Sequence, residues 1–319
     1  MGIRFLNRFL RDHCNKKSIR KIHLKHFANK TIVVDTSIYM YKFIGDNALM
    51  ENMYLLISIL KSYRITPIFI FDGKPPPEKK ELLNKRRMEK KEAEQKYLNL
   101  KATMSNSGED TTDIIAEMEN LRRQFLRIRD EDIRKTKELM DAYGARYYDS
   151  KSEADEVCAY LVKTGKAYAC LSDDMDMFLY SCPYVMRHLS IMNHTVILYD
   201  TSAILKDLEM SERHFCEIMV LSGTDYNINS NASLNETLRW YKEYKKYCVG
   251  QIEKEEFYVW LVNHTKYVSD YNSLQQIYNM FQIDNNSNLK EWDNLENINK
   301  EVDMDKLKNI MKTEGFLFC

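Results

Sequence analysis

Three aspartates stand within four positions in the middle of this sequence, at Asp173, Asp174 and Asp176. They follow the small and apolar residues 167–171, which predict a buried strand, and they precede an apolar stretch, 175–180, that predicts the start of a helix. Carboxylates gathered at the end of a core strand repel one another, so helix N-terminal amides or a bound cation must compensate their charge. The cluster therefore indicates a site that attracts positive charge.

Acidic residues recur after three further predicted strands. These strands and acids are 31–34 with Asp35, 65–71 with Asp72, and 145–148 with Glu153, Asp155 and Glu156. A single acid after a strand is usually a helix N-cap or a turn residue, but this explanation is weak for four strands together. Because the carboxyl ends of parallel strands meet at one edge of a sheet, we expect these acids to lie close together.

The chemistry of such an edge follows from its ligand type. Carboxylate oxygens without sulfur or imidazole select hard cations, and Mg²⁺ or Mn²⁺ binds through a few carboxylates while retaining water. Two such ions about 4 Å apart can clamp the attacking and leaving oxygens of a phosphodiester. The acids therefore predict hydrolysis of phosphodiesters by two metal ions.

The elements that must position these acids alternate between strand and helix. Helical patterns separate the four predicted strands, which favours an α/β fold with a mainly parallel sheet flanked by helices. Two later strands, 184–187 and 195–199, lie close enough in sequence to form an antiparallel edge. After about residue 200 helices dominate, and the clearest patterns are 211–221 and 236–247.

One long segment interrupts the alternation. Residues 78–142 contain a single glycine, Gly108, and no proline, and they are rich in Lys, Arg, Glu, Leu and Met. This composition predicts two or three charged helices, joined near 105–108. The segment is too long for an ordinary crossover and too polar to be fully buried, so we expect it to stand off the sheet.

The bulk composition is that of a globular protein. The 319 residues are 44% hydrophobic and 29% charged with a formal net charge of zero, but residues 1–30 carry nine Lys or Arg against one acid. The seven cysteines form no C-x-x-C pair, which favours buried thiols in a reducing compartment over a zinc site. Neither a membrane-spanning run nor a signal peptide is visible, so we expect a soluble intracellular protein.

Seven stretches of the sequence resemble, in order, the flap endonuclease family of structure-specific 5′-nucleases, to which the excision-repair nuclease XPG belongs. They are Met1-Gly-Ile3, Val34-Asp-Thr-Ser-Ile-Tyr-Met-Tyr41, Phe71-Asp-Gly-Lys-Pro-Pro76, Ser152-Glu-Ala-Asp-Glu156, Asp173-Asp-Met-Asp176, Met186-Arg-His-Leu189 and Leu221-Ser-Gly-Thr-Asp-Tyr226. The resemblance covers residues 1–226, about 70% of the chain. It implies a PIN-like nuclease core with a helical gateway and arch at about 78–142, followed by a helical C-terminal region at 227–319.

The resemblance also implies the roles of single residues. The residues that match metal-site carboxylates are Asp35, Asp72, Glu153, Asp155, Asp174, Asp176 and Asp225, and they would hold two Mg²⁺ ions, for which Mn²⁺ can substitute. Lys79 and Arg86 match the basic pair that contacts the scissile phosphate, and their spacing of seven puts them on one helix face. Asp173 matches a flanking acid that is not a principal ligand.

Further contacts with nucleic acid are implied near the N-terminus. Tyr41 matches an aromatic that stacks on a base near the cut, although a buried core tyrosine is an equally good interpretation of this position. Gly2 belongs to the family's characteristic start. The basic residues of 1–30 would contact phosphates by charge, so we expect binding that depends on salt and little on sequence.

Several departures from the family pattern limit what is transferred. Asp155 stands where the family usually has Glu, which shortens that carboxylate by one methylene. Residues 227–235 contain no glycine, so the helix-two-turn-helix that grips duplex and potassium in relatives is degenerate here. The last residues lack the motif by which many relatives bind the sliding clamp, so clamp binding is not expected. The 36 residues between Asp35 and Asp72 suggest a reduced wedge against the upstream duplex.

The expected function is that of a monomeric Mg²⁺-dependent 5′-nuclease that cuts DNA at 5′ flaps or free 5′ ends in replication or repair. By resemblance we place it in the nucleus rather than the cytoplasm. Two alternatives stay open at this point. One is a 5′-to-3′ exoribonuclease, and the other is a catalytically silent nucleic-acid-binding scaffold of the same fold.

Overall fold

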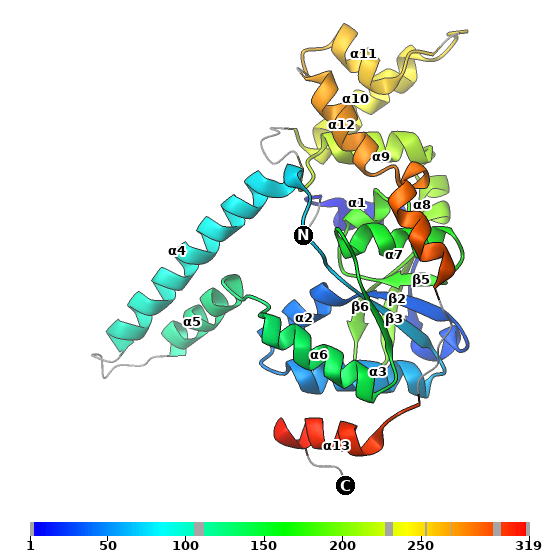
Figure 1. Cartoon of the computed structure of the whole chain (residues 1–319). Helices are drawn as coiled ribbons and strands as arrows, with labels where there is room; N and C mark the ends of the chain where they lie inside the picture. Colours follow the sequence, from blue (N-terminus) through cyan, green and yellow to red (C-terminus); the bar gives the residue numbers. More distant parts are fainter. Residues whose placement is uncertain are drawn as a thin grey trace.

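The computed structural model describes residues 3–104, 112–226, 232–252, 254–268, 270–295 and 301–316. Its centre is a seven-stranded mixed sheet with the order β1-β7-β6-β5-β2-β3-β4 (Figure 1). The strands are β1 Ile19–His23, β2 Thr31–Asp35, β3 Thr66–Phe71, β4 Arg146–Asp149, β5 Ala169–Leu171, β6 Tyr184–Ser190 and β7 Thr195–Asp200. Strands β4, β3, β2, β5 and β6 run parallel, whereas β7 is antiparallel to both β6 and β1. The prediction of a mainly parallel sheet with an antiparallel edge is confirmed.

Strand β1 is the one strand of the sheet that the sequence pattern missed. Its residues, IRKIH, alternate imperfectly and include three basic side chains, so no apolar run marks it. It forms the outer edge of the sheet and pairs with β7 from Ile19 opposite Tyr199 to His23 opposite Thr195. An edge strand needs only one apolar face, which explains the weak signal.

Helices cover both faces of the sheet. Side chains alternate along β2, so Val33 enters one hydrophobic cluster while Ile32 and Val34 enter the other. The first cluster includes side chains from α1 Leu6–His13, α7 Ala154–Lys163 and α9 Glu212–Leu221. The second includes side chains from α2 Thr36–Gly45, α3 Leu49–Ser62 and α6 Asp130–Ala142. This three-layer packing fixes the ends of the central strands on which the acids lie.

Residues 80–124 of the long charged insertion form a helical hairpin that stands away from the sheet (Figure 1). The expectation is wrong for the last helix of the insertion, α6, which packs against the sheet through Leu139, Met140 and Ala142. A 3₁₀ turn, Pro77–Lys79, leads into α4 Lys80–Met104, and α5 Thr112–Gln124 returns alongside it. The predicted junction at 105–108 lies outside the described residues. At its base, Arg122 donates hydrogen bonds to the carbonyl of Gly45 and the side chain of Asn47. These contacts tie the hairpin to the end of α2.

The C-terminal region is helical, as predicted. Its helices are α8 Thr201–Asp207, α9, α10 Leu234–Tyr247, α11 Phe257–His264, α12 Tyr271–Met280 and α13 Met304–Thr313, with 3₁₀ turns η4 Ile283–Asn285 and η5 Ser287–Asn294. Helices α9 to α12 stack above α7, on the side of the sheet that the first cluster covers, whereas α13 lies beyond α6, on the side of the second cluster (Figure 1). No helix in the parts of the chain described here is long and apolar enough to span a membrane.

Three expectations for this half of the molecule have different outcomes: the helix predicted at 175–180 is wrong, and those for the segment 227–235 and the boundary at residue 226 stay predictions. The apolar stretch after Asp174 forms only a single 3₁₀ turn, η3 Asp176–Phe178, because Ser181 adopts a left-handed conformation shortly after it. The degenerate segment 227–235 begins with 227–231, which lie outside the described residues. The boundary at residue 226 stays a prediction, since one hydrophobic cluster joins Val33 of the sheet with Phe257 and Tyr258 of α11.

Candidate active site

The ends of three adjacent parallel strands bring the predicted acids to one edge. Strand β2 lies between β3 and β5, so Asp35, Asp72 and the loop after Leu171 start side by side. Asp35 is the residue before α2, and Glu153 is the residue before α7. These two acids therefore sit where a strand passes into a helix, as predicted for an α/β sheet, whereas Asp225 follows the end of helix α9.

Asp35 is the most central of these acids. It is 3% exposed, and Ser172 Oγ donates a hydrogen bond of 2.9 Å to its Oδ2. Burial and the charges of Asp72 and Asp174 raise the pKa of Asp35 to about 8, although the Ser172 hydrogen bond acts in the opposite direction. The carboxylate form of Asp35 is thus favoured by any positive charge that enters the site.

Asp155 and Asp176 share this electrostatic situation. Burial raises the pKa of both well above the ordinary value, and neighbouring carboxylates add to the effect, chiefly Asp35 and Asp174 for Asp155 and chiefly Asp174 for Asp176. Asp176 is 3% exposed, and its Oδ1 has no hydrogen-bond partner in the described part of the chain. A buried carboxylate oxygen without a partner is costly, so this atom fits a place where a cation is bound.

Asp72 lies at the exposed rim of the site. Its Oδ1 accepts a hydrogen bond of 2.8 Å from the backbone N–H of Ala154, in the first turn of α7. The next residue, Gly73, passes so close to the neighbouring loop that a Cβ atom would lie 2.0 Å from the carbonyl oxygen of Ser150. Only glycine permits this approach, which holds Asp72 against the start of α7.

Two basic side chains from the start of the hairpin enter the acid cluster. Lys79 Nζ donates a hydrogen bond of 2.6 Å to Glu153 Oε1 and lies 3.8 Å from Asp225 Oδ2, while Arg86 donates to the same Asp225 oxygen at 2.9 Å. Lys79 is only 7% exposed. Burial alone would lower the pKa of Lys79, but Glu153 and Asp225 hold it above its usual range, so the ammonium stays charged.

Tyr226 joins these groups, and the sequence interpretation assigned it no role. Its hydroxyl donates a hydrogen bond of 2.8 Å to Glu153 Oε2, and Lys79 Nζ lies 5.0 Å from the centre of its ring. The ring packs edge-on against Phe281. The sequence signal that could have identified Tyr226 is its position next to Asp225 in the motif Leu221-Ser-Gly-Thr-Asp-Tyr226. Ser172, next to the acid cluster in sequence, was missed in the same way.

The acids do not form a finished coordination sphere in this arrangement. Among the described residues, no three His, Cys, Asp or Glu side chains are grouped closely enough to hold a metal ion. Lys79 and Arg86 supply the positive charge near Glu153 and Asp225 instead. The unpartnered Oδ1 of Asp176 and the raised pKa values of Asp35, Asp155 and Asp176 nevertheless fit a divalent cation held by oxygen ligands.

Asp173 is separated from the other acids by its contacts. Its Oδ1 accepts a hydrogen bond of 2.7 Å from the backbone N–H of His188, and its carbonyl oxygen accepts one of 2.7 Å from Arg187 Nη2. The side chain is therefore used to fasten the acidic loop to β6. This geometry agrees with its interpretation as a flanking acid.

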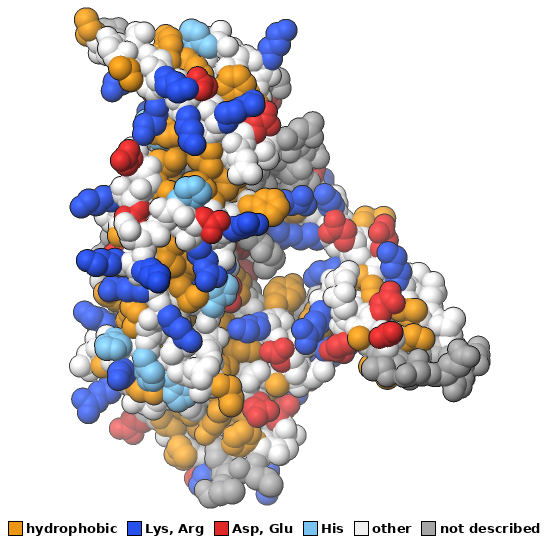
Figure 2. Space-filling model, turned by 180° about the vertical axis from the view of Figure 1, so that it is seen from behind, with side chains coloured by type: hydrophobic (Ala, Val, Ile, Leu, Met, Phe, Trp, Pro, Cys, Tyr) orange, Lys and Arg blue, Asp and Glu red, His pale blue; other side chains and the backbone are white. Residues whose placement is uncertain are grey.

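The remaining predicted contacts lie around the opening beside the hairpin. Tyr41, on α2, is 38% exposed, and Lys90 Nζ of α4 lies 5.1 Å from the centre of its ring. The interpretation of Tyr41 as a buried core residue is therefore wrong, whereas its neighbour Tyr39 is fully buried. Gly2 lies outside the described residues. In the space-filling view an opening remains between the hairpin and the body of the protein (Figure 2).

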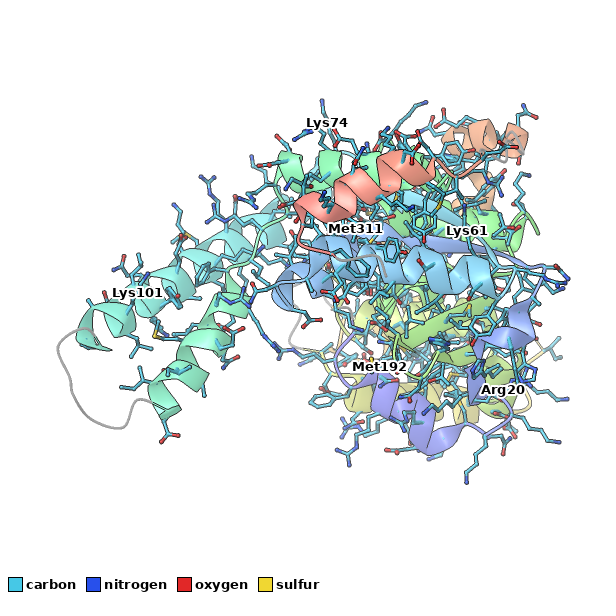
Figure 3. The ribbon with its side chains drawn as sticks, turned by 90° about the horizontal axis from the view of Figure 1, so that it is seen from below. Arg20, Lys61, Lys74, Lys101, Met192 and Met311 are labelled. Atoms are coloured by element: carbon cyan, nitrogen blue, oxygen red, sulfur yellow. The ribbon has the colours of Figure 1, made fainter. Side chains whose placement is uncertain are left out.

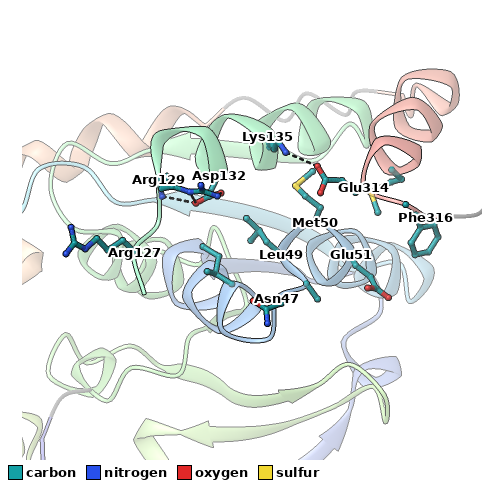
Figure 4. A pocket seen from close by; sticks show the side chains of 14 residues that line it. Asn47, Leu49, Met50, Glu51, Arg127, Arg129, Asp132, Lys135, Glu314 and Phe316 are labelled. Atoms are coloured by element: carbon teal, nitrogen blue, oxygen red, sulfur yellow. Dashed lines mark hydrogen bonds and ion pairs between the residues drawn. The ribbon is translucent and has the colours of Figure 1, made fainter. Parts of the chain in front are cut away.

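A cavity of about 690 Å³ lies away from the acids, between the α2–α3 turn, α6 and the end of the chain (Figure 4). Its charged lining is largely paired internally, since Arg129 contacts Asp132 at 3.2 Å and Lys135 contacts Glu314 at 2.9 Å. We therefore place the functional site at the acid edge rather than in this larger cavity.

The raised pKa values predict how the stability of the metal-free protein depends on pH. Asp35 has a pKa of about 8 in the folded protein but about 4 in an unfolded chain, so the folded state retains a proton that the unfolded chain has released. Stability should therefore fall as pH rises from about 4 to 8, and Mg²⁺ should restore it at pH 8. The measurement is Tm in EDTA against pH for the wild type and Asp35→Asn.

The variant isolates this contribution from other titrating groups. The difference in Tm between Asp35→Asn and the wild type should grow with pH by several degrees, since 1 kcal/mol corresponds to about 2–4 °C in a protein of this size class. A difference that stays constant between pH 5 and 8.5 would contradict the electrostatic interpretation of the site.

Comparison with known proteins agrees with this geometry. The family model of the XPG N-terminal domain matches residues 1–93, and that of the XPG I-region matches residues 144–225. A curated flap endonuclease 1 from Methanococcus aeolicus is 30% identical over 245 residues, which cover 72% of this chain and 70% of the relative. The chain belongs to the XPG-type flap endonuclease family. The two matched segments contain all of the predicted carboxylates as well as Lys79, Arg86 and Tyr41.

A second curated relative is longer than this chain, and solved structures of lower identity share its fold. Flap endonuclease 1 from Komagataella phaffii is 31% identical over 246 residues, which cover 71% of this chain, and the match spans 63% of that relative. The solved catalytic core of Rad2 with DNA substrate has a TM-score of 0.68 at 20% identity, covering 99% of this chain and 96% of that one. Human GEN1 with Holliday junction DNA has a TM-score of 0.63 at 17% identity, covering 98% and 74%. These structures share the PIN-like α/β fold.

Proposed function

We propose that this chain is a metal-dependent 5′-nuclease that hydrolyses DNA phosphodiesters at 5′ flaps or free 5′ ends. The observation that carries the proposal is the meeting of strand-end carboxylates with Lys79 and Arg86 at the base of an open helical hairpin. Family membership supports the reaction class. The action of the relatives on branched DNA supports the choice of substrate.

The carboxylates Asp35, Asp72, Glu153, Asp155, Asp174, Asp176 and Asp225 would hold two Mg²⁺ ions, for which Mn²⁺ can substitute. When bound, these ions supply an activated water and neutralise charge on the oxygens of the phosphodiester. Asp176 contributes an oxygen that has no other partner among the described residues, and Asp35 contributes one that Ser172 already orients.

Lys79 and Arg86 take a second role when substrate enters. The phosphodiester brings its own negative charge, so both side chains can exchange Glu153 and Asp225 for non-bridging phosphate oxygens. When Lys79 and Arg86 move to the phosphate, Glu153 and Asp225 become free to bind the metal ions. Lys79 and Arg86 then stabilise the negative charge that develops on the phosphate. The basic pair would thus couple entry of substrate to completion of the site.

The hairpin and Tyr41 would guide the single-stranded end. The opening beside α4 and α5 admits a strand, and the exposed ring of Tyr41 offers a base a stacking surface without reading its identity. The start of the chain at Gly2 would contribute to the same contact. We further propose that the protein acts as a monomer in DNA replication or repair, in the nucleus.

A substrate comparison tests the proposal. With Mg²⁺, a 5′ flap and a recessed 5′ end should be cut about 10-fold faster or more than a four-way junction or single-stranded RNA of matched length, a preference of about 1.4 kcal/mol. The products are resolved from 5′- and 3′-labelled strands, with EDTA as the blank. Preferred cutting of RNA would replace the proposal by the exoribonuclease alternative, and binding without cutting would favour the scaffold.

A further inference from the structure

The basic residues near the N-terminus lie in or next to α1, β1 and the 3₁₀ turn η1 Leu24–Phe27, and they form an exposed band. All nine are exposed, and we call them the basic band: Arg4, Arg8, Arg11, Lys16, Lys17, Arg20, Lys21, Lys25 and Lys30. Viewed from behind, Lys and Arg side chains gather down one side of the body, with acidic ones sparse among them (Figure 2). Viewed from below, Arg20 and Met192 lie in the lower half of the molecule and Lys74 lies at the top (Figure 3).

The charge of this band is largely uncompensated. Within the described residues, Arg8 is the one member that forms an ion pair, to Asp12 at 3.5 Å, and these side chains are 82% and 59% exposed. Lys30 lies over the ring of Tyr168 at 5.2 Å, which leaves its charge in place. Because the whole chain has no net charge, a face with so many unpaired cations is a local concentration of positive potential.

The band is held on firm structure rather than on a free tail. The turn that carries Lys16 and Lys17 is fastened by Asp207 of α8, which accepts hydrogen bonds from Asn15 N–H at 2.8 Å and Ser18 Oγ at 2.6 Å. Arg20 and Lys21 lie on β1, which pairs with β7 along its length. A polyanion would therefore meet cations whose positions are largely fixed beforehand, which lowers the entropic cost of binding.

Hydrogen bonds join helix α1 of the band to the acid edge. Asn7, on the same helix as Arg8 and Arg11, accepts hydrogen bonds from Arg187 Nη1 at 3.3 Å and from Tyr199 Oη at 2.7 Å. Arg187 in turn holds the carbonyl of Asp173, beside the proposed metal ligands. Helix α1, which carries part of the band, is therefore linked through the buried Arg187 to the loop that holds Asp173 and Asp174.

Two simpler explanations do not account for the whole band. Basic residues on an edge strand discourage pairing with other sheets, which explains Arg20 and Lys21 but not the cations of α1 or of the turn after it. A surface for single strands needs aromatic rings between the cations, and among the described residues 3–30 Phe5 is the one exposed Phe, Tyr or Trp, beside the exposed imidazoles of His13 and His26. A duplex needs only phosphate contacts.

We propose that the basic band binds the sugar-phosphate backbone of a duplex arm of the nucleic-acid substrate. The proposal rests on the proposed function, since the duplex is taken to be the part of the substrate that lies beyond the cut. It gives this chain a duplex contact independent of the degenerate segment 227–235.

The test compares two variants with the same loss of charge. The band variant combines Lys16→Ala, Lys17→Ala, Arg20→Ala and Lys21→Ala, and the control combines Lys290→Ala, Lys306→Ala, Lys308→Ala and Lys312→Ala, all exposed positions. Binding of a fluorescent flap substrate is measured in EDTA, where no cleavage occurs, over a series of KCl concentrations. Flap substrates with duplex arms of different length, a single strand and vesicles of anionic lipid are the probes.

The slope of log K against log salt decides the result. Each phosphate contact contributes about 0.9 to this slope on duplex DNA, so the band variant should lose up to about 3.6 on the long-arm substrate, whereas the control should match the wild type. Exchanging the four cations between Lys and Arg should retain the slope. Equal slopes for the band and control variants would overturn the proposal. So would a loss of slope on the single strand as large as that on the long-arm duplex substrate, or a loss of slope seen only with vesicles.

Cleavage is measured separately with Mg²⁺ on the short-arm flap. A wild type that binds through the band but cuts nothing would refute the nuclease proposal alone. A wild type that cuts, with a band variant whose slope is unchanged, would refute the band alone.

Discussion

Replacing Asp176 by asparagine should reduce Mg²⁺-dependent cleavage about 1000-fold or more while leaving the metal-free protein at least as stable as the wild type. The carboxylate is buried, its pKa is raised by burial and by Asp174, and its Oδ1 has no described partner. Removing the charge relieves repulsion in the empty site but removes a ligand when cations bind. Metal ions contribute several kcal/mol to such reactions, and each 1.36 kcal/mol is tenfold in rate.

Asp173→Asn is the matched control for this prediction. It removes a neighbouring charge of the same type, but its side chain faces the backbone N–H of His188 rather than the acids, and an asparagine oxygen can accept that hydrogen bond. Cleavage by the control should stay within a few-fold of the wild type, and Asp174→Ala should behave like Asp176→Asn. Rates are measured under single-turnover conditions, with DNA binding followed in EDTA. Cleavage by Asp176→Asn at the wild-type rate would remove Asp176 from the site.

The parallel part of the fold was accessible to sequence reasoning because its signals are local. Runs such as Ile32–Val34 and Pro67–Phe71 are apolar without interruption, as is typical of strands covered on both faces, and each is followed by an acid. Strand β1 was not accessible, because an edge strand buries one face and tolerates Arg20 and Lys21. The return of α13 to α6 was equally hidden, since it depends on the tertiary seating of Leu307 and Met311.

The members of the site could be predicted, but their pairing could not. The position of acids at strand ends follows from topology. The contact of Lys79 with Glu153 joins residues 74 positions apart and depends on how the start of the hairpin lies against the loop before α7. The same holds for Ser172, whose hydrogen bond to Asp35 spans 137 positions. Exposure was also beyond reach. Tyr39 and Tyr41 are two positions apart on α2, and only the fold decides that Tyr39 is buried and Tyr41 is exposed beside Lys90 of α4.

Replacing Lys79 by methionine should change metal binding and catalysis in opposite directions. Methionine retains an apolar stem of similar length but removes the ammonium that lies 2.6 Å from Glu153 Oε1. Glu153 and Asp225 then carry charge that Lys79 no longer offsets, so Mn²⁺ should bind the DNA-free protein more tightly, measured by calorimetry. Without the ammonium at the phosphate, kcat should fall about 100-fold or more, a typical loss for one preorganised electrostatic contact.

The opposed effects separate two roles that a loss of activity alone would confuse. If Lys79 served only to neutralise the acids until cations arrive, its removal would raise Mn²⁺ affinity and leave kcat unchanged. If it served only the phosphate, kcat would fall while Mn²⁺ affinity stayed constant. Lys80→Met is the control. Lys80 is the next residue in the chain, begins α4 and is exposed, so its substitution should alter neither kcat nor Mn²⁺ affinity. Only a fall in kcat together with a gain in Mn²⁺ affinity supports the exchange of partners, in which the Lys79 ammonium first binds Glu153 and then the substrate phosphate.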